Sequence, residues 1–147
     1  WARADRGLLS FVQRLARLRR AHPVLRQARF LHGRVRAQDG LRDLVWRKPD
    51  GQEPTPDDWN NPAWKTLCVE VRGAEEGRPG EAAGEAVFLI LNADKGMAVT
   101  LPPGGDWHLA LDTARPEVPE MPVTTPTVAC PATSVMVFIK RPAASPG

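Results

Sequence analysis

Four of the five tryptophans in this 147-residue sequence are the side chains whose type most directly suggests chemistry. An indole ring can stack on the apolar face of a sugar while its N–H donates a hydrogen bond. Trp59 and Trp64 lie in a polar loop, so we take them as candidate carbohydrate-binding residues. Trp46 and Trp107 lie in apolar runs, and we expect both in the hydrophobic core. Packing in the core or against a loop is the simpler alternative for all four.

The sequence carries no pattern that is typical of a catalytic site. A nucleophile needs a base beside it and a group that orients the base, and His22, His32 and His108 show no such arrangement. We expect His22 to cap a helix end and the other two histidines to be structural residues in strands. Asp57 and Asp58 are adjacent in a loop, whereas catalytic carboxylate pairs approach a substrate from separate positions. We therefore expect no catalytic residue, no metal site and no cofactor.

An amphipathic helix is predicted near the start of the sequence. At about 100° per residue, one arc collects apolar side chains and the opposite arc collects arginines. Asp5 suits the positive start of this helix, and Pro23 ends it near Ala21 or His22. Arg19 projects from the apolar arc, so we expect a carboxylate or carbonyl partner for it. The apolar arc is Leu8, Phe11, Val12, Leu15 and Leu18, and the basic arc is Arg3, Arg6, Arg14, Arg17 and Arg20.

The net charge of +3 hides an asymmetry along the chain. Residues 1–48 hold 13 basic and 3 acidic side chains, whereas the remaining residues hold 7 basic and 14 acidic ones. A basic half raises nucleic acid as a partner. However, no aromatic residues interleave with the helix arginines, and no zinc or RNA-binding motif accompanies them. A solvated basic face is the simpler interpretation, and nucleic-acid binding is a third-ranked hypothesis.

After the helix, short apolar runs recur between Gly, Pro, Asp and Asn, a pattern typical of β-strands. Short strands with frequent turns favour an antiparallel β-sandwich over alternating α/β structure. We expect Cys68 and Cys130 to be buried thiols within such runs. Long loops are expected at 48–64, 73–85 and 112–126, the second of them mobile. The expected strands are 29–32, 43–47, 66–72, 86–92, 98–101, 107–112 and 134–140.

Four segments follow one another in the order and spacing of a known family. They are LLSFVQRLARLRRAHPVLRQARFLHG, DLVWRKPDGQEPTPDDWNNPAWKTLCVEVRG, VFLILNADKGMAVTLPP and WHLALDT. The most specific are the helix that ends in AHPVLR and the pattern W-x-x-P-D-G … D-D-W-N between Trp46 and Asn60. Together they resemble the C-terminal end of bacterial glycogen debranching enzymes, in the isoamylase-like branch of the α-amylase superfamily of glycoside hydrolases. The resemblance covers nearly the whole sequence.

This resemblance implies a division of the chain and a role for it. In the family, a catalytic (β/α)₈ barrel precedes a C-terminal antiparallel β-sandwich, so residues 1–24 would correspond to the last barrel helix and 25–147 to the sandwich. The family hydrolyses α-1,6 branch linkages of glycogen-type glucans, with catalytic Asp and Glu residues on barrel strands that this sequence lacks. The resemblance therefore implies the tail of a larger enzyme, inactive alone, that stabilises the catalytic barrel and shapes its glucan cleft.

The predicted partners follow from the helix and the tryptophans. We expect the apolar arc to pack on the missing barrel; without that barrel, it folds back on the sheet or forms a homodimer through Leu8, Phe11, Val12, Leu15 and Leu18. The alternative function is an independent α-glucan-binding module that uses Trp59 and Trp64. No apolar run approaches the ~20 residues that cross a bilayer, so no membrane partner is expected. Nothing demands an oxidising compartment, and the cytoplasm is the expected location.

Overall fold

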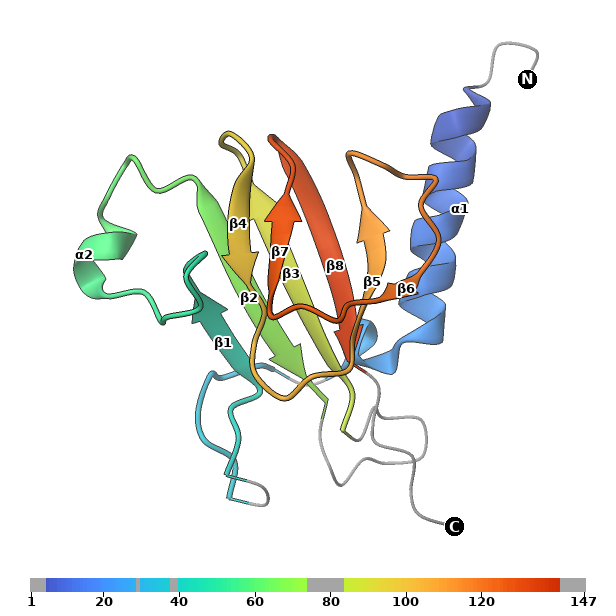
Figure 1. Ribbon diagram of the computed structural model, residues 1–147. Helices are drawn as coiled ribbons and strands as arrows, with labels where there is room; N and C mark the ends of the chain where they lie inside the picture. The colour runs from blue at the N-terminus through green and yellow to red at the C-terminus, as the bar shows by residue number, and fades with distance from the viewer. Residues whose placement is uncertain (1–4, 29, 38–39, 74–83, 141–147) are drawn as a thin grey trace.

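A six-stranded antiparallel sheet forms the middle of the molecule (Figure 1). The computed structural model describes residues 5–28, 30–37, 40–73 and 84–140. The strand order is β1-β2-β3-β8-β5-β6, and a second sheet pairs β4 with β7. This mainly antiparallel β architecture with an N-terminal helix confirms the predicted fold class. The strands are β1 (Leu44–Arg47), β2 (Thr66–Arg72), β3 (Ala86–Asn92), β4 (Met97–Thr100), β5 (Trp107–Asp112), β6 (Met121–Pro122), β7 (Thr127–Cys130) and β8 (Ser134–Lys140).

Four of the predicted strands have the predicted bounds, namely β2, β3, β5 and β8. The strand predicted at 29–32 is wrong, because its described residues form no regular structure. There the carboxylate of Asp43 accepts the backbone N–H groups of His32 at 3.1 Å and Gly33 at 2.8 Å, which removes the donors that a strand pairing would use. The sequence did not predict strands β6 and β7. A mobile loop was predicted at 73–85, and most of it lies outside the described residues.

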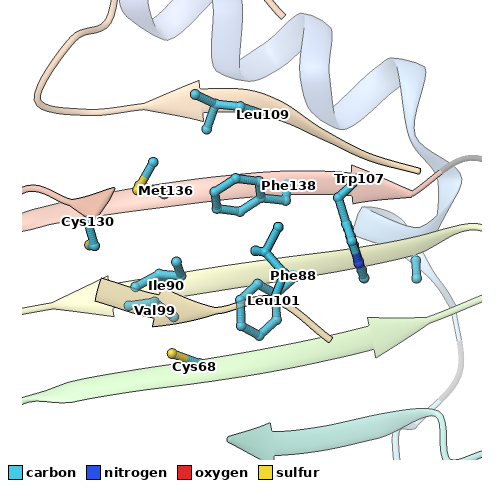
Figure 2. Packing of buried hydrophobic residues seen from close by; sticks show 11 residues of the cluster. Cys68, Phe88, Ile90, Val99, Leu101, Trp107, Leu109, Cys130, Met136 and Phe138 are labelled. Carbon is cyan, nitrogen blue, oxygen red and sulfur yellow. The ribbon is translucent and has the colours of Figure 1, made fainter. Parts of the chain in front are cut away.

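The main hydrophobic core lies between the two sheets (Figure 2). Phe88 of β3 and Phe138 of β8 are fully buried, with their ring centroids 6.3 Å apart. Trp107 is buried as predicted, and its ring N–H donates to the carbonyl of Pro102 at 2.9 Å. Cys68 and Cys130 are free, buried thiols of the same core, which also confirms the prediction. Burial raises the pKa of Cys68 to about 12.

A buried amide joins the two sheets at one end. Asn92 accepts a hydrogen bond from the hydroxyl of Thr66 at 2.8 Å, and its amide donates to the carbonyls of Lys95 at 3.0 Å and Pro131 at 2.8 Å. These partners lie in β2, in the turn that leads to β4, and in the turn between β7 and β8. Because a buried amide is costly unless its bonds are made, this side chain fixes the positions of both turns.

Helix α1 (Arg6–Ala21) packs on the opposite face of the six-stranded sheet. As predicted, Asp5 caps its start, accepting the backbone N–H groups of Gly7 and Leu8 at 2.9 and 3.0 Å. Only two members of the predicted apolar arc, Phe11 and Leu18, pack against the second core cluster, around Val137 and Ile139 of β8. The helix therefore folds back on the sheet, one of the two arrangements expected in the absence of a barrel; the homodimer stays a prediction.

The predicted basic arc is divided by this packing. Arg14 lies on the sheet side of α1, where its guanidinium donates to the carbonyls of Ala110 at 2.9 Å, Val118 at 2.5 Å and Pro116. The expectation that Arg14 belongs to a solvated face is thus wrong, since Phe11, Arg14 and Leu18 follow one seam of the helix. Arg19 was expected to be buried and therefore to need a carboxylate or carbonyl partner. It is exposed instead, so the reason for expecting that partner does not apply.

The junction after α1 is held by a buried contact between the side chains of His22 and Glu85. His22 caps the helix as predicted, its backbone N–H donating to the carbonyl of Leu18 at 3.1 Å. Its imidazole Nδ1 lies 2.6 Å from Oε1 of Glu85, and Oε2 of Glu85 accepts the backbone N–H of Val24 at 3.3 Å. The 3₁₀ helix η1 (Pro23–Arg26) follows directly.

Within the described ranges, no helix is both long and apolar enough to cross a membrane.

Candidate functional site

A pocket of about 460 Å³ opens along the free edge of β1. Since β1 is the first strand of the sheet, it pairs with β2 on one side only. The segment 31–33 lines one part of the pocket, and the residues from Glu53 to Trp59 line another. The edge strand itself contributes Leu44, Val45 and Trp46. Figure 1 shows short helix α2 (Pro56–Trp59) beyond this edge, on the side of the molecule away from α1.

Three tryptophans gather beside the pocket, with Trp59 between the other two. The ring centroids of Trp46 and Trp59 are 5.9 Å apart and those of Trp59 and Trp64 are 5.0 Å apart, both in edge-to-face geometry. The structure thus brings together the two predicted candidates, Trp59 and Trp64. Trp59 lines the pocket; Trp64 does not, and its ring nitrogen is buried without a hydrogen-bond partner.

Trp46 is not a core residue, contrary to the prediction. It is 37% exposed, because an edge strand has a neighbour on one side only and its residues alternate between the two faces. Val45 is buried, whereas Trp46 pairs with Val69 and extends from the other face toward Trp59. Trp46 is therefore a pocket residue that sequence reasoning assigned wrongly, and its place beside a Pro- and Asp-rich loop was the signal available for it.

The loop after β1 fixes the position of Trp59. It first makes a tight turn in which Lys48 and Gln52 share a backbone hydrogen bond of 2.8 Å and Gly51 adopts a φ of 86°, a conformation that favours glycine. A capping box then begins α2, since Asp58 accepts the backbone N–H of Thr55 at 2.8 Å and returns its own to the Thr55 hydroxyl at 3.2 Å. The backbone N–H and the hydroxyl of Thr55 both donate to the Asp58 carboxylate, and these two hydrogen bonds lower the pKa of Asp58.

Arg42 and Glu53 form a bidentate ion pair at the pocket wall. Nη1 of Arg42 lies 2.7 Å from Oε2 of Glu53, and Nη2 donates to the other carboxylate oxygen. The hydrogen bond raises the pKa of Arg42 and lowers that of Glu53, so both groups are charged near neutral pH. The two charges compensate each other, and the pair offers both donors and acceptors to a ligand. Neither residue was singled out from the sequence.

The structure gives the other sequence candidates separate positions. Asp57 is exposed, Asp58 caps α2, and His22 pairs with Glu85. His32 lines the pocket at the free edge of β1, which we call the tryptophan pocket. His108 lies on β5, and its Nδ1 is buried without a hydrogen-bond partner. Within the part of the chain that the structure describes, no three His, Cys, Asp or Glu side chains are grouped to hold a metal ion.

A second surface feature is the side of α1 that the sheet does not cover. Leu8, Leu9, Val12 and Leu15 are all exposed, although each is a large apolar residue. They follow the helix next to the buried seam of Phe11 and Leu18, and we call them the open helix face. Three of them belong to the predicted apolar arc, which thus divides between the sheet and solvent. Contiguous exposed apolar surface of this kind marks interaction sites.

Comparison with known proteins finds similarity to one region of several much longer proteins. It is 30% identical to the glycogen operon protein GlgX homologues of Mycobacterium tuberculosis and Mycobacterium bovis, over 95% of this chain and 21% of the relative. It is 25% identical to the isoamylase of Pseudomonas amyloderamosa, over 77% of this chain and 13% of that protein. An isoamylase of a Flavobacterium species is 28% identical over 71% of this chain and 14% of that protein. No family model matches.

These matches confirm the resemblance that the sequence motifs indicate. The alignment with the mycobacterial proteins covers 95% of this chain, which is nearly its whole length. The chain itself spans only about a fifth of the length of these curated relatives. It is therefore a homologue of one region of GlgX-type proteins and isoamylases, related to the C-terminal region of bacterial glycogen debranching enzymes.

Proposed function

We propose that this chain is a non-catalytic accessory domain of a debranching glycoside hydrolase that cleaves α-1,6 linkages of glycogen-type glucans. The observation that carries the proposal is the open helix face. Its four side chains lie on a well-formed helix that the rest of the fold holds in place, yet nothing in the described chain covers them. The relatives extend far beyond the aligned region, so a longer polypeptide would supply the missing surface.

The energetics favour a role in stabilising that larger protein. Full burial of a Leu or Val side chain stabilises by roughly 1.5–3 kcal/mol. The four residues are about half exposed, so their remaining burial would contribute roughly 3–6 kcal/mol in total. That is a large fraction of the 5–15 kcal/mol that holds a typical domain folded. A catalytic barrel docked on the open helix face would be stabilised appreciably by this contact.

The first test is the intact mass of the natively expressed product, measured by immunoblot and mass spectrometry. We expect a polypeptide several times heavier than the 16.1 kDa of this chain. That product should release linear chains from glycogen, and the 147-residue chain should not. A native product of 16.1 kDa, or debranching at an enzyme-like rate by this chain alone, would falsify the proposal.

The second test addresses the open helix face within the longer product. Leu8→Asp and Leu15→Asp each place a charge in the proposed contact and should lower the thermal midpoint of the catalytic activity. Arg17→Asp changes the charge on another exposed side of the same helix and is the matched control. Equal midpoints for all three variants would show that the face contacts nothing in the enzyme.

A second candidate function is α-glucan binding by the domain itself. The observation that favours it is the contact between the exposed Trp59 and its neighbours Trp46 and Trp64 at the mouth of a pocket. The two functions are compatible, since the tryptophan pocket and the open helix face lie on different elements. Association of glucan with the isolated chain tests this candidate without any catalytic domain.

A further inference from the structure

We propose that the pocket at the free edge of β1 binds a short stretch of neutral α-glucan, with Trp59 as the stacking surface and the Arg42–Glu53 pair as a hydroxyl clamp. This assignment rests on the second candidate function above and gives it a place and a mechanism. It replaces the pair Trp59 and Trp64 as the binding surface, since Trp64 supports Trp59 from outside the pocket.

Trp59 has the properties that sugar stacking requires. The residue is 48% exposed, so ring surface is open to a ligand. The indole rings of Trp46 and Trp64 contact the Trp59 ring edge-to-face, at interplanar angles of 90° and 61°. These contacts hold the indole in one orientation, and the capping box of α2 fixes its backbone. A ligand that stacks on this ring loses little of its binding free energy to ordering the protein.

The Arg42–Glu53 pair supplies the polar half of the site. A guanidinium carries five N–H donors, and the bidentate pair uses two of them. The Glu53 carboxylate likewise keeps lone pairs that remain free to accept from a hydroxyl. Neighbouring sugar hydroxyls each donate and accept, so they match such a pair. Since the charges of Arg42 and Glu53 compensate each other, the pocket favours a neutral ligand over an anionic or cationic one.

The pocket's size limits what can occupy it. Its volume of about 460 Å³ lies in the lower half of the range for small-ligand sites, about 300–1,000 Å³. A few linked sugar rings fit that volume, and the remainder of a glucan chain would leave through the open mouth.

Calorimetric titration of the 147-residue chain with maltoheptaose tests the site, with tryptophan fluorescence as a second readout. We expect saturable binding and a spectral shift in the native sequence. Trp59→Ala should weaken the affinity at least tenfold, and so should the double variant Arg42→Met with Glu53→Met, which removes the clamp without leaving one charge unpaired. Met121→Ala is the matched control, since Met121 is exposed on β6 at the other edge of the sheet; its affinity should stay within twofold.

The outcomes separate this assignment from its alternatives. Circular dichroism and the thermal midpoint establish that Trp59→Ala is folded; the clamp variant provides an independent reading if it is not. Absence of maltoheptaose binding at millimolar concentrations, or equal affinity in the native, Trp59→Ala and clamp variants, overturns the assignment. Equal binding of β-1,4-linked cellohexaose overturns its α-glucan class. None of these results affects the intact-mass test, so the accessory role can stand when the sugar site fails.

Discussion

Replacing Arg14 by Met tests whether α1 is an integral part of this domain. The guanidinium donates to three carbonyls of the 110–118 segment, two of them at 2.9 and 2.5 Å, across a partly buried interface. A hydrogen bond to a charged group contributes about 1.5–3 kcal/mol. The three share one guanidinium, and water replaces part of what is lost, so we expect Arg14→Met to lower the free energy of unfolding by about 2–4 kcal/mol.

Urea denaturation followed by far-UV circular dichroism measures this loss directly. For a chain of this length, about 2–4 °C in thermal midpoint corresponds to each kcal/mol, so the midpoint should fall by about 5–15 °C. Arg17→Met is the matched control, since it removes the same charge from an exposed position one turn away. It should change stability by no more than about 0.5 kcal/mol. Equal effects of the two substitutions would refute the docking of α1 through Arg14.

Three further predictions concern the interior. Phe138→Ala removes a fully buried ring, so the free energy of unfolding should fall by about 3–5 kcal/mol in urea titrations, and a smaller loss would mean that the core between the sheets is loosely packed. Burial raises the pKa of Cys68 from 9.0 to about 12, so between these pH values the folded state keeps a thiol proton that the unfolded state releases. The free energy of unfolding should therefore fall as pH rises from about 9 to about 12. In Cys68→Ala it should fall less steeply. A double-mutant cycle of His22→Gln and Glu85→Gln should give a coupling of about 1–3 kcal/mol, and additive effects would show that this pair does not hold the helix junction.

The strands that could be predicted from the sequence are those whose apolar pattern and bounding turn residues lie within a few neighbouring positions. The strands β3 and β8 are continuous apolar runs bounded by turn residues, and both have the predicted bounds. The segment 29–32 has only two apolar residues, and the Asp43 carboxylate accepts the backbone N–H of His32, a partner that no local pattern could predict. The short strands β6 and β7 follow Pro-rich segments and depend on their pairing with β5 and β4, so propensity alone misses them.

Residue type singled out two of the clustered tryptophans from the sequence, whereas the geometry of the pocket could not be predicted. Trp59 and Trp64 were recognised because indoles in a polar loop need a reason to be there, and the structure places them in contact. Trp46 was assigned to the core because its neighbours are apolar; only the strand order reveals that β1 is an edge. Arg42 and Glu53 are 11 positions apart in the sequence, and only the turn after β1 brings them together.

The position of β8 has a consequence for synthesis. It is the last strand of the described chain, yet it lies between β3 and β5, with all seven of its residues paired to β3. A ribosome releases the two halves of the sheet well before the strand that joins them, so a nascent chain exposes the apolar edges of both halves until residue 140 has emerged. Chains that terminate before β8 would leave the sheet without the strand that joins β3 to β5, and would be substrates for chaperones and proteases rather than partly working domains.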